Sequence, residues 1–209
     1  MLHQVANLFF IGFVSSMMNA TTNAINFRAR FIQKVPIQKY NSKTQSYEPL
    51  KANFVEVDPK NSRDIDAVCN ISETWKGQLF AGDIANRAEK IERGELSEYN
   101  NKIYLLTTQK KKLHRLDDGK ILGAMLVERK LADPDEIRYF QVKPTSKYGV
   151  KNRKYTHVGE AMLESVKQIY NKAITLFSSA GAVGFYKTHG FKLIDPEVVQ
   201  FIWRNKNIK

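Results

Sequence analysis

The 209-residue sequence is poor in the residues that form covalent or metal crosslinks. It has one cysteine, Cys69, and only four histidines, two tryptophans and six prolines. A single cysteine cannot form an intramolecular disulfide, and one thiol with four scattered histidines shows none of the spacings of cysteine-based metal sites. We therefore expect no bound metal, a plain packed thiol at Cys69 and a reducing, cytoplasmic location.

The sequence also lacks an apolar run long enough to cross a membrane. Its most apolar stretch near the start, Leu8 to Val14 (LFFIGFV), is much shorter than the roughly 20 residues that a spanning helix needs. No Lys or Arg precedes this stretch, which does not suit a secretory leader. We expect no membrane association and interpret the stretch as a helix or strand that packs on the domain or on a partner chain, so a homodimer stays open.

Positive charge is abundant but unevenly distributed. The formal net charge is +12, while the hydrophobic fraction of 43% is that of a globular domain. Residues 61–100 carry five Lys or Arg against eight Asp or Glu, whereas residues 101–170 carry fifteen against eight. A basic surface invites a nucleic-acid partner, but no recognition helix, zinc spacing or aromatic RNA-binding motif accompanies it. We expect no nucleic-acid partner.

Local patterns predict a short N-terminal extension followed by one domain. Residues 41–49 (NSKTQSYEP) are polar and turn-forming, which indicates a linker, so we expect an extension over residues 1–48 and a domain over residues 49–209. A helical region over 63–93 should break near Gly77 or Gly82 and end at Gly94. Alternating or β-branched patterns predict strands over 51–57, 102–109, 121–129, 136–142 and 174–178.

The helix predicted over residues 157–171 carries apolar residues on one face. Val158, Met162, Val166, Ile169 and Tyr170 recur at helical spacing. The order of elements is strand, two helices, three strands, helix, strand, short helix, strand. This order predicts an α+β fold with a mixed, largely antiparallel central sheet flanked by helices.

The start of that helix has the features of a phosphate site. Residues 155–161 read YTHVGEA, and the first turn of a helix has unpaired N–H groups and the positive end of the dipole. Gly159 would allow a phosphate to approach the backbone. Basic residues precede the segment without an intervening acid: Lys143, Lys147, Lys151, Arg153 and Lys154. The alternative is a helix that Thr156 caps, preceded by a solvated basic loop.

Residues 173–194 (AITLFSSAGAVGFYKTHGFKLI), taken with residues 156–161 (THVGEA), resemble the signature of the GNAT family of acyl-CoA-dependent N-acyltransferases. The resemblance covers residues 50–194 and is strongest from Glu136 onward. In the family, an Arg/Gln-x-x-Gly-x-Gly/Ala loop wraps the coenzyme pyrophosphate. Here Thr156 stands in place of the Arg or Gln, and the loop before it is longer, so Arg153 or Lys154 would supply the charge.

The resemblance implies roles for a defined set of residues. Tyr186 would be the catalytic acid that protonates the departing thiolate. The residues implied in coenzyme binding are Phe140, Gln141, Val142, Arg153, Lys154, Thr156, His157, Val158, Gly159, Glu160, Ala161, Ser179 and Phe185. The alternative for Tyr186 is a half-buried aromatic side chain that packs the short helix on the sheet.

The general base is not defined by the sequence. Glu136 and Glu128 are the nearest carboxylates, and each is also interpretable as an ordinary surface or strand-end acid. His157 and His189 flank the coenzyme region, where helix-end histidines commonly act as caps. The acidic helical region around Trp75 borders the acceptor site in the family, and an acidic rim would suit a cationic amine, although a solvated helical face explains it equally.

The expected function is therefore an N-acetyltransferase. It would transfer an acetyl group from acetyl-CoA, a cosubstrate, to a primary amine acceptor by direct attack within a ternary complex. The acceptor is a small molecule or a protein amine. The alternative is a catalytically silent GNAT-like module that binds an acyl-CoA or a partner.

Overall fold

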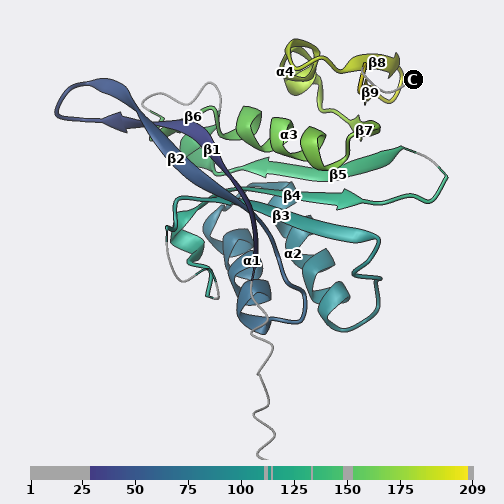
Figure 1. The fold of residues 1–209 in the computed structure, drawn as a ribbon, viewed down its shortest axis with the longest axis horizontal. Coiled ribbons are helices and arrows are strands. Elements are labelled where there is room, and N and C mark those ends of the chain that lie inside the picture. Colours follow the sequence, from purple (N-terminus) through teal and green to yellow (C-terminus); the bar gives the residue numbers. More distant parts are fainter. Residues whose placement is uncertain (1–28, 111–112, 114, 133, 148–152, 207–209) are drawn as a thin grey trace, which may run out of the picture.

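The computed structural model describes residues 29–110, 113, 115–132, 134–147 and 153–206. These residues form one nine-stranded sheet with helices on both faces (Figure 1). The strands are β1 (Arg30–Asn41), β2 (Ser46–Glu56), β3 (Asn101–Thr107), β4 (Ile121–Glu128), β5 (Asp135–Val142), β6 (Tyr155–Thr156), β7 (Ala173–Phe177), β8 (Lys192–Asp195) and β9 (Gln200–Arg204). The α-helices are α1 (Ser62–Thr74), α2 (Leu79–Glu92), α3 (Val158–Ile169) and α4 (Val183–Thr188).

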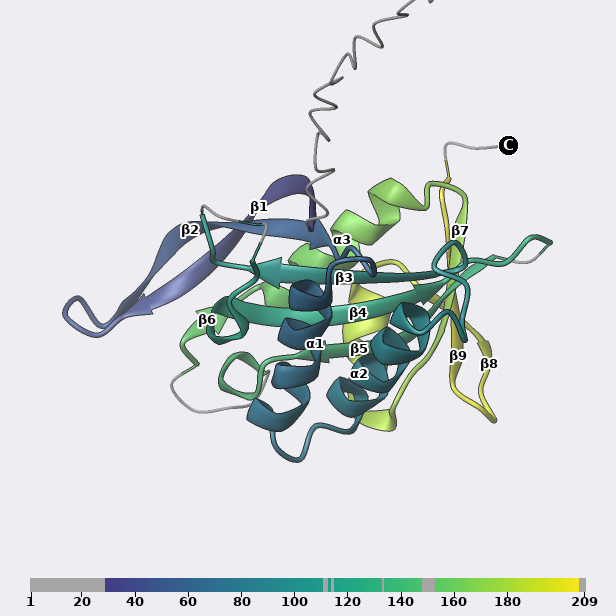
Figure 2. The ribbon, with the colours of Figure 1, turned by 90° about the horizontal axis from the view of Figure 1, so that it is seen from below.

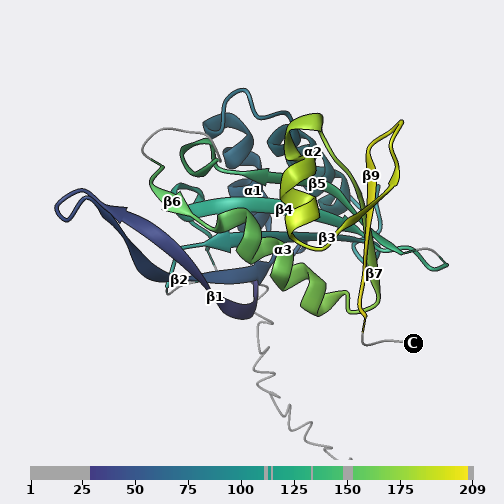
Figure 3. The same cartoon turned by 90° about the horizontal axis from the view of Figure 1, so that it is seen from above.

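The strand order across the sheet is β6-β1-β2-β3-β4-β5-β7-β9-β8. Every neighbouring pair is antiparallel except β5 and β7, which are parallel. A parallel pair needs a crossover connection, which contains α3 here. Helices α1 and α2 lie on one face of the sheet (Figure 2), and α3 and α4 lie on the other (Figure 3). The predicted mixed, largely antiparallel sheet flanked by helices is confirmed.

Each face of the sheet has its own apolar core. Val158, Met162 and Val166 of α3 are buried against one face, as their helical spacing predicts. Ile71 of α1 and Ile84 of α2 are buried against the other. Among the described residues, no helix is both long and apolar enough to span a membrane.

The N-terminal hairpin departs most from the sequence prediction. Residues 41–49 are not a linker, because β1 ends at Asn41 and β2 begins at Ser46, so they contain the hairpin turn. The two strands pair from Arg30 and Glu56 to this turn, and Val35 and Ile37 are buried in the core that contains α3. A tight turn and a linker share the same polar composition, and only the strand pairing tells them apart. Residues 30–48 thus belong to the sheet; residues 1–28 of the expected extension lie outside the described residues.

The remaining elements lie close to their predicted ranges. The three strands expected after the helical region are β3, β4 and β5, and they form the predicted antiparallel meander. The helical region breaks at residues 75–78, where Gly77 has a φ of +75°, whereas Gly82 lies inside α2. Gly94, with a φ of +74°, follows the end of α2 as predicted.

Asp64 is a buried carboxylate in the first turn of α1. Its side chain is 0% exposed, and Oδ1 has no hydrogen-bond partner, while Oδ2 accepts a long hydrogen bond (3.4 Å) from the Asp58 N–H. Burial raises the pKa of the Asp64 carboxyl to about 7. The folded protein therefore favours the protonated form of this side chain.

We expect Asp64→Asn to flatten the dependence of stability on pH. The folded pKa lies above the unfolded value, so the ionisation of Asp64 removes stability as the pH rises from about 4 to about 7. The variant should lose a slope of about 1 kcal/mol per pH unit in this range and be more stable than the wild type at pH 8. Urea unfolding at several pH values measures this, with Asp66→Asn, exposed on the same helix, as control. Equal slopes for wild type and Asp64→Asn would contradict the assignment.

Candidate functional site

The candidate site begins where β5 loses one of its two neighbouring strands. The pairing of β5 with β7 covers only Asp135 to Ile137. Directly after this point the register with β4 shifts, so that Arg138 is an extra residue between Ile137 and Tyr139. Such a bulge bends the strand and increases its twist. Residues 138–142, which we call the open edge of β5, therefore have β4 on one side and no partner strand among the described residues on the other.

Side chains of the open edge alternate between the two faces of the sheet. Phe140 and Val142 lie next to Gly159 on the α3 face. On the α2 face, Gln141 Nε2 donates to Gln78 Oε1 (3.0 Å), and the Tyr139 ring lies 6.0 Å from the Phe80 ring. All four open-edge side chains named here are partly exposed. The edge thus offers unpaired backbone groups that are accessible from either face.

Helix α3 begins beside this edge without a side-chain cap. Its N-cap residue is His157, in the left-handed region at a φ of 61°, and the His157 side chain makes no capping hydrogen bond. The N–H groups of Val158, Gly159 and Glu160 in the first turn are therefore not satisfied by that cap. Together with the helix dipole, they favour an anion at this end of α3.

Gly159 is the point of closest approach between α3, the open edge and α4. A Cβ atom at this position would lie 3.4 Å from Phe185 Cζ, 3.6 Å from Phe140 Cζ and 3.6 Å from Val142 Cγ2. These are ordinary van der Waals distances, so a larger side chain would fill the space between the three residues. The absence of a side chain keeps the first-turn backbone open toward the open edge.

The side chains of Thr156, His157 and Glu160 point elsewhere. Thr156 Oγ1 donates to Gln38 Oε1 (3.2 Å), because β6 pairs with β1. His157 and Glu160 form a pair (2.7 Å) and line a cavity of about 420 Å³ between β1 and α3, also lined by Ala161. The Thr156 side chain thus contacts β1, and the side chains of His157 and Glu160 contact each other; the role of these residues in coenzyme binding stays a prediction.

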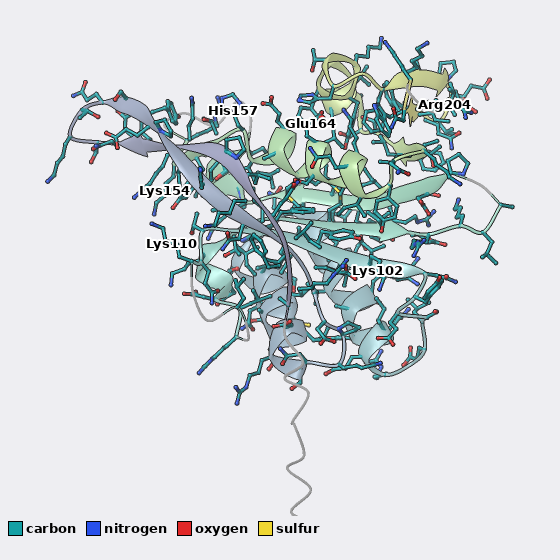
Figure 4. The ribbon with its side chains drawn as sticks, viewed as in Figure 1. Lys102, Lys110, Lys154, His157, Glu164 and Arg204 are labelled. Atoms are coloured by element: carbon teal, nitrogen blue, oxygen red, sulfur yellow. The ribbon has the colours of Figure 1, made fainter. Side chains whose placement is uncertain are left out.

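The basic loop is held by the N-terminal hairpin. The Tyr40 N–H donates to the Lys154 carbonyl (2.9 Å), and the Tyr47 hydroxyl donates to the Arg153 carbonyl (2.9 Å). Lys154 is exposed on the side of the hairpin (Figure 4), with Nζ 5.9 Å from the centre of the Tyr155 ring. The two cations thus contribute to the field near the start of α3, while Lys151 lies outside the described residues.

Tyr186 lies on α4 within an aromatic cluster. Its ring centre is 5.3 Å from that of Phe185, 5.8 Å from Phe191 and 5.9 Å from Phe201, and the residue is only 8% exposed. Its hydroxyl has no hydrogen-bond partner in the described part of the chain, yet it is not among the fully enclosed polar atoms. Burial raises the pKa of Tyr186 to about 12. The phenol is therefore protonated at neutral pH and free to donate.

Phe185 and Ser179 occupy different surroundings on this side of the sheet. Phe185 is partly buried; besides its approach to Gly159, its ring centre lies 4.4 Å from that of His189. Ser179 is exposed at the start of a 3-10 turn (Ala180–Ala182), and its carbonyl accepts from the Ala182 N–H (3.0 Å). Phe185 is thus part of the contact around Gly159, whereas Ser179 lies at the turn that leads into α4.

Glu136 and Glu128, the two carboxylates considered as general bases, both lie in an ion-pair cluster. Burial alone would raise the pKa of Glu136, but hydrogen bonds from Lys130 (2.7 Å) and Arg138 (2.8 Å) outweigh it and hold the pKa below its usual value. Glu128 lies 3.5 Å from Arg138 in the same cluster. The bulge at Arg138 and the turn between β4 and β5 bring these four residues together, which their sequence spacing does not predict.

Three other side chains singled out in the sequence have structural roles. His189 Nδ1 lies 2.8 Å from the Phe185 carbonyl at the end of α4, and His157 pairs with Glu160. Burial, followed by the charge of Glu89, raises the pKa of Cys69 to about 11, so this thiol is a poor nucleophile.

Lys167 is a buried residue that the sequence did not single out. It lies on α3, is 8% exposed, and donates to the His189 carbonyl (2.5 Å) and to Glu164 Oε1 (2.6 Å). Its ammonium group also lies 5.4 Å from the Phe191 ring centre and 5.6 Å from that of Trp203. Lys167 therefore ties α3 to the end of α4. Its place directly after Val166, within the buried face of the helix, is the only sequence signal for this role.

Several solved acetyltransferase structures are similar to this chain. An acetyltransferase from Thermus thermophilus is 13% identical with a TM-score of 0.48, covering 74% of this chain and 97% of that one. Tetrahymena GCN5 is 11% identical with a TM-score of 0.46, covering 72% and 91%. A GNAT family acetyltransferase from Elizabethkingia anophelis with acetyl-CoA bound is 15% identical with a TM-score of 0.38, covering 54% and 82%. No protein-family model and no curated protein matches the sequence.

The chain has the mixed, largely antiparallel sheet with helices on both faces that the sequence predicts. From β2 to β8 the elements follow the order that the sequence predicts, apart from the short strand β6; the structure adds β9 after them and shows that β5 and β7 form a parallel pair. The similar structures named above are 11–15% identical to this chain, and the chemistry of the site is argued from the residues of this chain.

We expect Lys167→Met to destabilise the protein by about 1–3 kcal/mol, because the buried His189 carbonyl loses its charged donor and two rings lose a cation. Lys187→Met, at an exposed position of α4, should change the free energy of unfolding by less than about 0.5 kcal/mol. Urea unfolding of both variants measures the difference. Equal stability of the two variants would show that Lys167 does not join α3 to α4.

Proposed function

We propose that this protein transfers an acetyl group from acetyl-CoA to a primary amine by direct attack within a ternary complex. The observation that carries the proposal is the uncapped first turn of α3 beside the open edge of β5. Gly159, in that turn, lies next to Phe140 and Val142 of the open edge and adds no side chain between them. An anion-binding backbone next to an edge of unpaired strand N–H groups suits a diphosphate joined to a thioester.

The residues present fit such a coenzyme. The N–H groups of Val158, Gly159 and Glu160 would hold its phosphates, and the backbone of Phe140 to Val142 would align the chain that bears the thioester. Arg153 and Lys154 would add long-range attraction. A side chain longer than alanine at residue 159 would fill the space between Phe140, Val142 and Phe185 that a coenzyme would need.

The chemistry asks three things of the site. The amine nitrogen must attack the thioester carbonyl as a neutral base, a donor must polarise that carbonyl, and the departing sulfur needs a proton. A backbone N–H of the open edge would polarise the carbonyl. The Tyr186 hydroxyl, which is protonated at neutral pH, would give its proton to the sulfur as the C–S bond breaks. The proton of the attacking amine would pass to water, because Glu128 and Glu136 are held in ion pairs.

A second candidate is a GNAT-like module that binds an acyl-CoA or a partner without catalysis. The ion pairs of Glu136 and the packing of Tyr186 among three phenylalanines favour it. The two candidates differ in turnover and agree in coenzyme binding. For both, the single cysteine suits a cytoplasmic location.

We expect Gly159→Glu to weaken acetyl-CoA binding at least tenfold, since it places bulk and negative charge at the first turn of α3. The control is Gly82→Glu, which adds the same side chain on α2 where nothing lies within 4 Å of a new Cβ. Calorimetric titration of wild type and both variants, at two salt concentrations, measures the affinity. If Gly159→Glu binds as well as the control, the coenzyme does not lie at this end of α3.

Removal of the Tyr186 hydroxyl should separate turnover from binding. We expect Tyr186→Phe to lower kcat about tenfold or more while the acetyl-CoA affinity stays within about twofold, because a group that acts only as the thiolate leaves does not hold the ground state. Thiol release during amine acetylation measures kcat, and thermal unfolding checks that the aromatic cluster persists. Full activity of the variant would remove Tyr186 as the acid.

A further inference from the structure

The open edge of β5 is reached from two faces, and only the α3 face has the phosphate features. On the other face, two aromatic side chains lie together at the edge. The Tyr139 ring lies 6.0 Å from the ring of Phe80, which is 37% exposed in the first turn of α2. The amides of Gln78 and Gln141 join the same helix to the edge.

Phe177 places a third ring on this face. It follows Leu176, the last residue of β7 that pairs with β5, so it lies beside the start of the open edge. Leu176 is buried in the core on the α3 face, and side chains alternate along a strand, so Phe177 projects on the α2 face. It is 50% exposed. We call Phe80, Tyr139 and Phe177 the aromatic rim.

Exposed apolar side chains continue on both sides of the aromatic rim. Leu79, next to Phe80, is 77% exposed; Val198 is 53% exposed in the β8–β9 turn, whose next residue, Val199, accepts a hydrogen bond from the Ser178 N–H at the end of β7. Large apolar residues exposed singly need no explanation, but a group of them around one strand edge indicates a binding surface.

Charge on this face is limited. Glu128 and Glu136 are neutralised by Arg138 and Lys130, so they do not offer a row of carboxylates to a polycation. Asp83 follows Phe80 by one turn of α2, which puts its partly buried carboxylate on the same flank of the helix. One carboxylate beside several rings suits a single positive charge carried by an apolar body.

We propose that the acceptor is a primary monoamine attached to an aromatic or similarly flat apolar group, which packs against the aromatic rim. This inference rests on the proposed acetyl transfer and names the substrate class for it. The acceptor reaches the open edge from the α2 face, opposite the phosphate-binding end of α3, so that amine and thioester meet at the unpaired strand. Such an acceptor carries one positive charge, whereas a polyamine carries several.

The test compares acceptors that differ in the group next to the amine. Initial rates of thiol release from acetyl-CoA are measured with 2-phenylethylamine, n-butylamine and spermidine as separate acceptors. We expect kcat/KM for 2-phenylethylamine to exceed the other two at least tenfold. Phe80→Ala and Phe177→Ala should each lower that value about five- to tenfold, while leaving the rates with n-butylamine and the affinity for acetyl-CoA within twofold.

The matched control is Leu131→Ala, which removes an exposed apolar side chain at the opposite end of β5 and should change no rate. A preference for spermidine, or equal losses with all three amines in Phe80→Ala and Phe177→Ala, overturns the aromatic acceptor. Calorimetric titration of the same wild-type sample with acetyl-CoA distinguishes a failure of this inference from a failure of the proposed function. If acetyl-CoA binds and the aromatic amine is not preferred, only this inference fails; if acetyl-CoA does not bind, the proposed function fails with it.

Discussion

The candidate site depends on one interruption of strand pairing. β5 and β7 are parallel neighbours for three residues, and the bulge at Arg138 then turns β5 so that its remaining half has one free edge. Unpaired backbone groups are costly when buried, so an exposed strand edge next to a helix start is an arrangement that a ligand can satisfy. The uncapped first turn of α3, Gly159 and the aromatic rim are of interest as a site because they lie beside this edge.

The N-terminal hairpin contacts the segment that leads into this region. β1 pairs with β6, the two residues that directly precede His157, and Tyr47 of the neighbouring strand β2 binds the Arg153 carbonyl. This pairing fixes where the chain enters α3, and it uses the Thr156 side chain in doing so. Pro36 lies on the edge of β1 and lacks an N–H, which blunts that edge against further strand addition. The hairpin is thus part of the support of the first turn of α3.

Some of the charged side chains around the candidate site are held in local ion pairs. The +12 net charge suggested a basic surface with a distant polyanionic partner, yet Lys130 and Arg138 neutralise two carboxylates and Lys167 joins two helices. The same pairing removes Glu136 from the role of base, because a carboxylate whose pKa is lowered by two cations holds protons poorly. The net charge is a property of the composition, whereas the role of each charged side chain depends on its contacts in the fold.

Sequence patterns determined much of this protein. Periodicity placed α3 and its buried face, the alternating runs placed β3, β4 and β5, and the GNAT resemblance pointed to Gly159 and Tyr186, because each of these signals is local in the chain. The same local reading placed a linker at the β1–β2 turn, since a turn and a linker have the same composition.

Only the tertiary structure decided which side chains meet. It turned His157 and Glu160 toward β1 and brought Lys130 to Glu136. It also placed Phe80 beside Tyr139, which lies far from it in the chain. Contacts between distant segments depend on strand register and on the bulge at Arg138, and a shift of one residue moves a side chain to the other face of a sheet. The sequence therefore predicted most of the elements from β2 to β8 in their order, and the packing of the sheet decided which side chains lie together around the open edge.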